Sequence, residues 1–226
     1  YGVNPLVNGM YAGDPNQLLV HKAMPHLKAM EQKYGSVLRG LVHHKDSYSR
    51  QEVFSFVEGM STLPNAISEK LVSLHKEHRV EMITRAQGRY VVSCATSGDY
   101  DTEEYNLLVL ALPAYQAAEL LHFTFPGMAA ALQNINYPPM AMVYSVYNRH
   151  DVGHHLKGFG ALHPKVEDTF AAGSIWTSSV FDGRCRPHEV MFTTFVGGSQ
   201  YTQNALVERT TQMRKVHEEL RRLYNI

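Results

Sequence analysis

Neither sign of charge is in excess in this sequence. It has 226 residues, of which 21 are Lys or Arg and 21 are Asp or Glu. Proteins that hold nucleic acid through its phosphates usually carry a basic excess, so this balance argues against that class and predicts no nucleic-acid partner. Hydrophobic residues make up 44% and charged residues 19% of the chain. These proportions are typical of a folded globular protein and exclude a disordered one.

Cysteine is also scarce, with only Cys94 and Cys185. Two cysteines are too few for a disulfide framework or a cysteine-rich zinc site, so we expect two unpaired, mostly buried thiols in a reducing compartment. No apolar run approaches the ~18 residues that a membrane span needs. The opening stretch, YGVNPLVNGMYAGDP, has no initiator methionine and no secretory pattern, so we expect a piece of a longer protein.

The short motifs that mark common catalytic sites are absent as well. There is no GxGxxG or GxxxxGK[ST] phosphate loop and no GxSxG nucleophile turn. The 13 histidines include the adjacent pairs His43-His44 and His154-His155. Because neighbours in sequence rarely share one face of a helix or strand, no metal site is predicted. The carboxylate pairs Glu103-Glu104 and Glu218-Glu219 are interpreted as solvated charges.

The patterns that are present predict helices at the start of the chain. Asp14-Pro15 is a typical helix start, because Asp caps free backbone N–H groups and Pro suits the first turn. Apolar residues recur at helical spacing up to Gly35, a typical stop, and a second helix is predicted over Ser36–His43. A third begins near Thr62, after a glycine turn at Gly59. Its predicted buried stripe consists of Leu63, Ala66, Ile67, Leu71 and Leu74.

The middle of the chain predicts strands and then helices. Alternation over Val80–Thr84 and Tyr90–Ala95, around a Gln87-Gly88 turn, predicts a β-hairpin. The run YNLLVLALP, residues 105–113, is continuously apolar and predicts a strand buried on both faces. The helices predicted after it cover Ala114–Leu121 and Pro126–Gln133.

After Tyr137-Pro138-Pro139 the pattern returns to β, with glycine and proline turns that fit an antiparallel sheet. The predicted strands are Ala141–Tyr147, Gly158–Leu162, Gly173–Ser178 and Val190–Val196. A final helix is predicted over Tyr201–Tyr224, with EELRR (218–222) in solvent. Its predicted apolar face consists of Ala205, Leu206, Met213, Val216, Leu220 and Leu223. The fold class predicted is α+β, with a helical opening and then a mixed or antiparallel sheet with flanking helices.

Seven stretches of the sequence stand out as an ordered set. They are NGMYAGDPNQL (8–18), SFVEGMSTLPNAI (55–67), LLVLALPAYQAAELL (107–121), INYPPMAMV (135–143), GFGALHP (158–164), GSIWTSSVFDGRC (173–185) and MFTTFVGGS (191–199). In this order they resemble the oxygen-dependent protoporphyrinogen oxidases, flavoenzymes of haem biosynthesis in the monoamine-oxidase-like superfamily. LALPAYQAAELL alone would fit many flavin amine oxidases, whereas YAGDP, YPP, GFGAL and TTFVGG together are much more specific.

The resemblance covers nearly the whole chain but implies only part of an enzyme. In that family a flavin-binding unit with GxGxxG comes first and a second flavin-binding segment comes last, and neither is in this sequence. The chain therefore resembles the central portion of an FAD-dependent oxidase that converts protoporphyrinogen IX to protoporphyrin IX, and we expect it to be inactive alone. Residues 1–50 are assigned to the end of a helical, membrane-contacting region, 51–121 to an FAD-proximal region, and 122–226 to the substrate-binding sheet and terminal helix. Residues 57–60 read VEGM, whereas many members of the family have two consecutive glycines at this place.

By position, the resemblance implies five residues at the substrate. The backbone of Gly9 is implied to lie near the porphyrinogen carbon that is oxidised, which makes Gly9 the candidate catalytic residue. Phe159 and Leu162 are implied to line the tetrapyrrole pocket. Ile175 is implied to sandwich one pyrrole ring with Leu162, and Phe195 to stack on another ring. Apolar side chains on rigid strands suit a large, mostly apolar substrate.

The cofactor implied by the resemblance is FAD. Val80 is implied to contact its adenine through the backbone, and Leu112 and Pro113 to pack near it at the end of a strand. The implied partners are a tetrapyrrole substrate, the cytoplasmic membrane as a peripheral contact, and a second copy in a homodimer. The implied location is the cytoplasm or the cytoplasmic membrane surface.

Two alternatives stay open. One is a fragment of a related flavin oxidoreductase, such as an amine oxidase or a carotenoid-type desaturase. The other is a non-catalytic tetrapyrrole-binding domain, which the missing GxGxxG allows. Single residues do not decide between them, because Leu162, Ile175 or Phe195 taken alone would suit an ordinary core.

Overall fold

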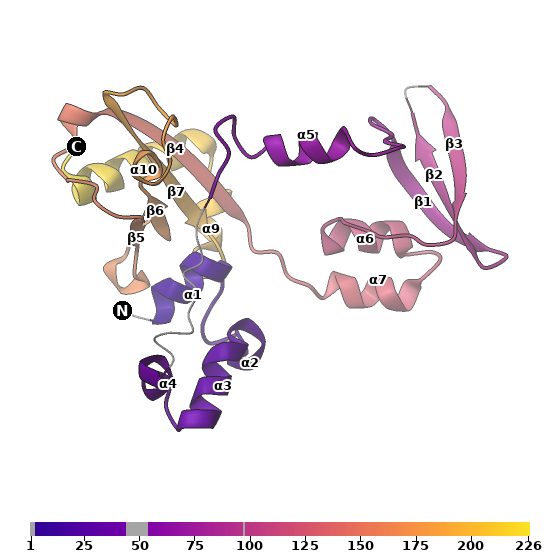
Figure 1. Cartoon of the computed structure of the whole chain (residues 1–226), viewed down its shortest axis with the longest axis horizontal. Coiled ribbons are helices and arrows are strands. Elements are labelled where there is room, and N and C mark those ends of the chain that lie inside the picture. The colour runs from indigo at the N-terminus through magenta and orange to yellow at the C-terminus, as the bar shows by residue number, and fades with distance from the viewer. Residues whose placement is uncertain (1–2, 44–53, 97) are drawn as a thin grey trace. The chain divides into compact units, whose positions relative to one another are not determined.

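The computed structural model describes residues 3–43, 54–96 and 98–226. It confirms the predicted α+β mixture of helices and antiparallel strands (Figure 1). In chain order the elements are α1 (Val3–Tyr11), α2 (Val20–Ala23), α3 (Pro25–Tyr34), α4 (Val37–His43), α5 (Thr62–Ser68), β1 (Arg79–Ala86), β2 (Arg89–Ala95), β3 (Tyr100–Tyr105), α6 (Ala114–Leu121), α7 (Pro126–Gln133), β4 (Met140–Asn148), β5 (Gly160–Leu162), β6 (Gly173–Ile175), α8 (Thr177–Val180), β7 (Glu189–Gly197), α9 (Thr202–Leu206) and α10 (Arg209–Tyr224).

Two compact units make up the chain. Unit 1 combines the residues up to Met60 with Pro138–Ile226, and unit 2 is Ser61–Tyr137. The ranges 1–50, 51–121 and 122–226 have different bounds, because the chain leaves unit 1 after Met60 and returns to it at Pro138. The three ranges were assigned from the roles that the family resemblance implies, and those roles stay predictions.

Unit 1 is built on a four-stranded antiparallel sheet with the strand order β4-β7-β6-β5. The two long strands pair from Met140 opposite Gly197 to Asn148 opposite Glu189. β6 is shorter than the predicted strand Gly173–Ser178, because the chain turns into the helix α8 after Ile175. β5 likewise starts at Gly160. The short strands β5 and β6 thus form one edge of the sheet.

One face of this sheet packs against α10. Phe192 and Val196, which alternate with Phe195 along β7, form a core with Val216 and Leu220 of the helix. Figure 1 shows α10 alongside β4 and β7. Because successive side chains of a strand point to opposite faces, Phe195 points away from α10. The strand pleat therefore separates a buried face from a second face that is free to line a site.

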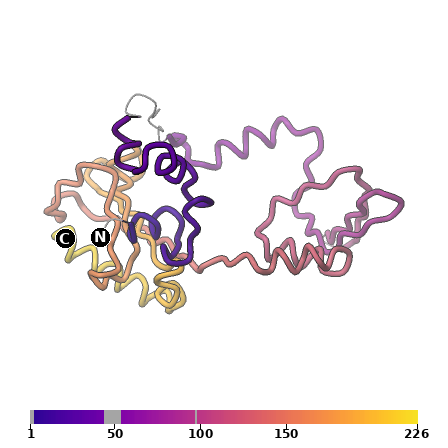
Figure 2. Tube along the Cα trace, turned by 90° about the horizontal axis from the view of Figure 1, so that it is seen from below, coloured from indigo at the N-terminus to yellow at the C-terminus, as the bar shows by residue number. Residues whose placement is uncertain are grey.

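The helical opening of unit 1 differs from the prediction. The sequence pattern does not predict α1, and the chain after Asp14 forms a turn in which Asp14 Oδ1 accepts the N–H of Asn16 at 2.9 Å. The predicted helix is also interrupted, because Pro25 has no N–H to continue α2 and instead starts α3. Gly35 ends α3 in the left-handed region, as predicted, and α4 confirms the second helix. These helices are the indigo part of the trace in Figure 2.

Unit 2 contains the predicted hairpin. β1 and β2 pair around Gln87-Gly88, both of which have positive φ, and β3 extends the sheet to the order β1-β2-β3. Ala118, Leu121 and Ala129 of the helices α6 and α7 form a core with Ile83 of β1. Both helices have the predicted bounds. The helix pair therefore gives the sheet of unit 2 its only described core.

The predicted buried strand over residues 105–113 is wrong. The polar stretch Tyr100–Tyr105 forms β3 instead, and no described strand pairs with 106–113. Leu107 and Val109 are 78% and 79% exposed. Leu108 and Leu110 are partly buried against the core of unit 2, so the described residues cover one side of the run. A continuous apolar run is buried completely only where neighbours cover both of its faces. The predicted helical stripe is also exposed. Leu63, Ala66 and Ile67 lie on α5, which ends at Ser68, and Leu71 and Leu74 follow it.

The predicted final helix is divided into α9 and α10. Glu208 starts α10 by accepting a hydrogen bond from the N–H of Thr211. A side-chain hydrogen bond from Thr210 and further bonds to backbone N–H groups hold the pKa of Glu208 below its ordinary value. Val216 and Leu220 are buried as predicted. The predicted apolar residues Leu206, Met213 and Leu223 are exposed.

Within the part of the chain that the structure describes, no helix is both long enough and apolar enough to cross a membrane.

Candidate functional site

Unit 1 contains an apolar cavity of about 310 Å³, which we call the slot. It lies between α1 and the edge of the sheet that β5 and β6 form. Its lining residues are Asn8, Gly9, Met10, Met140, Phe159, Gly160, Ala161, Leu162, Ala172, Gly173, Ser174, Ile175 and Phe195. Asn8, Ala172 and Ser174 are buried, whereas Phe159 and Leu162 are exposed. The slot therefore has a buried inner end and an apolar mouth.

The register of the sheet brings the slot side chains onto one face. Leu162 lies opposite Gly173, and Gly173 lies opposite Phe195, so these three form one row across β5, β6 and β7. Gly160 and Ile175 form the next row. Directly opposed residues of antiparallel strands share a face, and this is the face that points away from α10. Gly173 leaves an open position between the larger side chains of its row.

Gly9 closes the slot from the side of α1. A Cβ atom placed on Gly9 would lie 2.3 Å from Cδ2 of Leu162, which is closer than two carbon atoms can approach. Only a residue without a side chain lets Leu162 pack over the helix backbone here. The helix and β5 thus meet at the predicted catalytic glycine.

The five residues predicted at the substrate all line the slot. Gly9, Phe159, Leu162, Ile175 and Phe195 come from four separate parts of the sequence and meet in one cavity. Their roles toward a ligand stay predictions. Sequence reasoning missed the neighbouring lining residues Asn8 and Met140. The only signal for them was their place in the stretches NGMYAGDP and INYPPMAMV.

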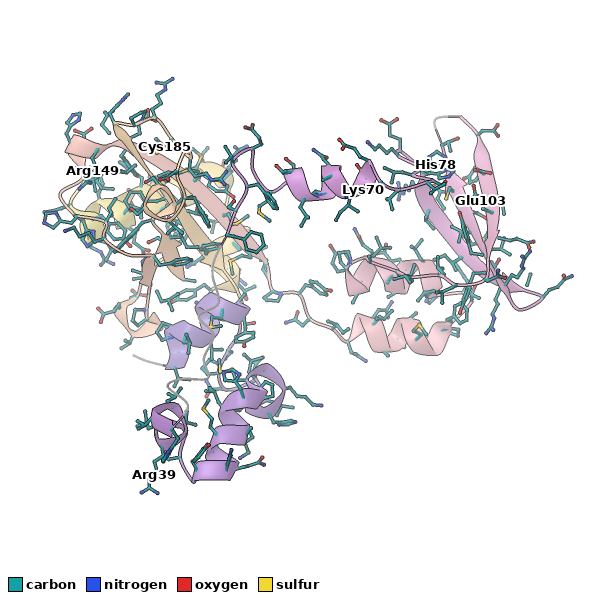
Figure 3. All side chains as sticks on the ribbon, in the orientation of Figure 1. Arg39, Lys70, His78, Glu103, Arg149 and Cys185 are labelled. Carbon is teal, nitrogen blue, oxygen red and sulfur yellow. The ribbon has the colours of Figure 1, made fainter. Side chains whose placement is uncertain are left out.

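Two of the three residues predicted at the cofactor share a groove in unit 2. Val80 and Leu112 line a groove of about 600 Å³, and its other lining residues are His78, Arg79, Glu81, Gln116, Glu119 and Leu120. Pro113 is not among them and instead precedes the first residue of α6. Figure 3 labels His78 just before β1. This groove is rich in charged and polar residues, unlike the slot.

The groove contains a free backbone edge. β1 is an edge strand, so alternate backbone N–H and C=O groups along it face away from β2. The ladder shifts between Val80 and Met82, which leaves Glu81 as the extra residue of a bulge. A free backbone edge beside Val80 can form hydrogen bonds with a purine base. These residues present no loop for a pyrophosphate.

A buried hydrogen bond supports the slot from behind. Nδ1 of His163, the residue after β5, lies 3.0 Å from Oε1 of Glu219 on α10, and the two side chains are 4% and 7% exposed. The Glu219 carboxylate also accepts the backbone N–H groups of Phe170 and Ala171. The prediction that Glu219 is a solvated charge is therefore wrong, because three donors replace its water. Glu218 is exposed, as predicted.

The thiols are free, as predicted, but both are only partly buried, whereas mostly buried thiols were expected. Partial burial, followed by the nearby Asp101 and Glu103 carboxylates, raises the pKa of the Cys94 thiol. Cys185, labelled in Figure 3, donates to the backbone oxygen of Glu189 at 3.3 Å. Among the described side chains there is no group of three His, Cys, Asp or Glu placed to hold a metal ion. Neither thiol belongs to the slot or the groove.

Comparison with known proteins relates this arrangement to a family. Residues 3–225 match the family model for flavin containing amine oxidoreductase. The chain is 29% identical over 246 residues to protoporphyrinogen oxidase 1, chloroplastic, of Spinacia oleracea, covering 98% of this chain and 43% of that protein. It is also 29% identical over 220 residues to protoporphyrinogen oxidase of Homo sapiens, covering 87% of this chain and 44% of that protein. The chain thus spans less than half the length of these relatives.

Solved structures agree on the fold. A crystal structure of a proposed protoporphyrinogen oxidase from Exiguobacterium sp. 255-15 superposes with a TM-score of 0.76 at 21% identity, covering 98% of this chain and 47% of that one. A triple mutant of putrescine oxidase superposes with a TM-score of 0.56 at 16% identity, covering 74% of this chain and 35% of that one. With the match over residues 3–225, these findings establish that the chain belongs to the flavin containing amine oxidoreductase family.

Proposed function

We propose that this chain supplies the substrate-binding slot of an FAD-dependent oxidase that converts protoporphyrinogen IX to protoporphyrin IX. The observation that carries the proposal is the meeting of Gly9, Phe159, Leu162, Ile175 and Phe195 in one apolar cavity. The spinach and human relatives are both named protoporphyrinogen oxidase, which supports the same substrate class. The whole activity then needs flavin-binding segments that this sequence does not contain.

The chemistry of the slot suits a pyrrole ring. Its lining has no Lys, Arg, Asp or Glu, so it favours an uncharged, apolar part of a ligand. A cavity of about 310 Å³ would take part of the macrocycle, with its pyrrole rings and bridging carbons, while the charged propionates stay outside. Leu162 and Ile175 would hold the ring between them, and Phe195 would stack on a neighbouring ring. Gly9 carries no side chain, so the substrate carbon would lie close to the backbone of α1.

In this proposal the chain's own residues bind and orient the substrate. Bound FAD would accept the hydrogen removed from the porphyrinogen carbon. The slot walls exclude water from that carbon and fix its orientation, which is the main contribution a protein makes to a cofactor reaction. The Val80 backbone and Leu112 would hold the adenine end of FAD in the groove of unit 2.

An amine substrate is the alternative that the putrescine oxidase likeness raises. A polyamine is a cation along its whole length, and a cation in an apolar site needs a carboxylate or a cage of aromatic rings. The slot offers no carboxylate, and its aromatic side chains are Phe159 and Phe195 alone. Its lining therefore favours the porphyrinogen.

A direct titration separates the two substrate classes. We expect the 226-residue chain to bind protoporphyrin IX, a stable stand-in for the porphyrinogen, with a Kd of about micromolar or weaker, and not to bind putrescine. Isothermal titration calorimetry measures both. Phe159→Ala should weaken porphyrin binding, because the ring stands at the slot mouth. The control Phe123→Ala, in unit 2 and 87% exposed, should leave binding unchanged. Binding of putrescine without porphyrin would contradict the proposal.

A further inference from the structure

The face of the sheet that lines the slot continues beyond it onto the edge strand β4. Leu162, Gly173 and Phe195 form one row across β5, β6 and β7, and all three line the slot. Met142 lies directly opposite Phe195 in the pairing of β4 with β7. Directly opposed residues of antiparallel strands share a face, so Met142 is the fourth member of the row. Met140, two residues earlier on β4, already lines the slot.

The packing of β4 shows which way its side chains point. Ala141, Val143 and Tyr147 pack against the core that β7 forms with α10. Because successive side chains of a strand point to opposite faces, Met142 and Tyr144 point to the slot side of the sheet. They are 55% and 57% exposed. The described residues therefore leave about half of each of them open to a ligand.

The helix α8 closes the neighbouring part of this face. Oγ1 of Thr177 on α8 lies 2.6 Å from Oγ1 of Thr193, the residue opposite Tyr144 on β7. Thr193 is only 7% exposed. Beyond Phe195 the face is thus covered over β7 and open over β4. A ligand that extends from Phe195 out of the slot meets Met142 first and Tyr144 next.

We propose that Met142 and Tyr144, which we call the β4 surface, hold the part of the tetrapyrrole that extends beyond the slot. This inference rests on the proposed function. The slot, of about 310 Å³, takes only part of the macrocycle. A macrocycle of four pyrrole rings is wider than the ~4.8 Å between neighbouring strands, so a ring stacked on Phe195 has neighbours on both sides. One neighbour lies in the slot and the other lies over β4.

The two side chains suit two different parts of that ligand. The thioether of Met142 is polarizable and packs favourably against an aromatic ring. The Tyr144 hydroxyl has one partner among the described residues, the Sδ atom of Met142 at 4.0 Å, and a thioether is a weak acceptor. A carboxylate is a much stronger acceptor for a hydroxyl. The Tyr144 hydroxyl therefore donates a hydrogen bond to a propionate at the edge of the macrocycle.

Titration of protoporphyrin IX into matched variants tests the β4 surface. Met142→Asp places a carboxylate against the macrocycle, so affinity should fall about tenfold or more. Its control is Met213→Asp, because Met213 is 53% exposed on α10, which covers the other face of the sheet. Affinity in the control should stay within about twofold of wild type, and calorimetry measures both.

A second pair of variants tests the hydrogen bond. Tyr144→Phe should weaken protoporphyrin IX binding about fivefold, because one hydrogen bond to a carboxylate is lost. Tyr147→Phe, on the opposite face of the same strand, should not weaken it. Protoporphyrin IX dimethyl ester has no carboxylate and should bind Tyr144→Phe and the wild-type chain within about twofold of each other. An equal loss with acid and ester would overturn the hydrogen bond.

Methionine oxidation maps the contact in the wild-type chain, which keeps the test decisive if Met142→Asp does not fold. Hydrogen peroxide oxidises exposed methionines, and peptide mass spectrometry measures the rate at each position. With saturating protoporphyrin IX, in the dark, oxidation of Met142 should slow about threefold or more, because the macrocycle covers the sulfur. Oxidation of Met213 should not change.

Leu162→Asp separates this inference from the proposed function. Weaker binding to Leu162→Asp, together with unchanged affinity of Met142→Asp and unprotected Met142, would overturn the β4 surface and leave the slot in place. If the wild-type chain bound no porphyrin, or Leu162→Asp bound it as tightly as wild type, the proposed function would fail and the β4 surface with it.

Discussion

At the scale of single residues, the slot depends as much on missing side chains as on those present. Gly9 lets Leu162 approach the backbone of α1, and Gly173 leaves an open position between Leu162 and Phe195. The positions of Gly9, Leu162 and Phe195 in the slot could be predicted from the ordered family stretches alone, whereas Gly173 is not predicted there. Hydrophobic periodicity would not have found them, because glycine adds nothing to a periodic pattern.

Gly9→Ala should close the slot without unfolding the chain. The new Cβ atom would displace the side chain of Leu162, so porphyrin affinity should fall about tenfold or more. Stability should change by less than about 1 kcal/mol, because alanine favours a helix and offsets the crowding. Gly127→Ala, in α7 with open space around it, is the matched control. Calorimetry and urea unfolding measure the two effects. Equal affinity in both variants would remove Gly9 from the site.

At the scale of elements, long-range polar contacts hold the slot in place. Glu219 of α10 holds His163 directly after β5 and the backbone of Phe170 and Ala171 directly before β6. The helix thereby fixes both strands that carry Leu162 and Ile175. The sequence does not predict this contact, because EELRR suits a solvated helix face and the partners of Glu219 lie 48 to 56 residues away.

Glu219→Gln should destabilise unit 1. A neutral amide replaces the carboxylate that accepts three donors, so the free energy of unfolding should fall by about 2–3 kcal/mol. Glu218→Gln is the matched control, since Glu218 is an exposed neighbour paired only with Arg214 and should change stability by less than about 0.5 kcal/mol. Urea unfolding of both variants measures the difference. Similar values for the two would mean that the Glu219 contacts contribute nothing beyond a surface charge.

At the scale of the whole molecule, the largest errors of sequence reasoning share one cause. Periodicity predicts burial correctly where the chain supplies its own neighbours, as in α6, α7 and the sheet of unit 1. In the hairpin it predicts the strands but the wrong face of β1, because the bulge between Val80 and Met82 shifts the alternation, so that Met82 is exposed and Ile83 is buried. Periodicity fails over residues 105–113, where Leu107, Val109 and Leu112 are exposed, and on α5, where Leu63 and Ile67 are exposed. The chain spans less than half the length of its relatives, and such segments are buried only when other elements cover them. A local pattern does not reveal whether those elements are present.

The central claim is that the slot binds a tetrapyrrole, and titration of protoporphyrin IX into wild-type chain and Leu162→Asp tests it most directly. Leu162 is 45% exposed on the slot wall, so a carboxylate there should not unfold the chain. It would put charge against an apolar ring and repel the propionates. We predict saturable binding to wild type, at least tenfold weaker binding to Leu162→Asp, and equal urea unfolding midpoints. Equal porphyrin affinity in the two chains would contradict the account.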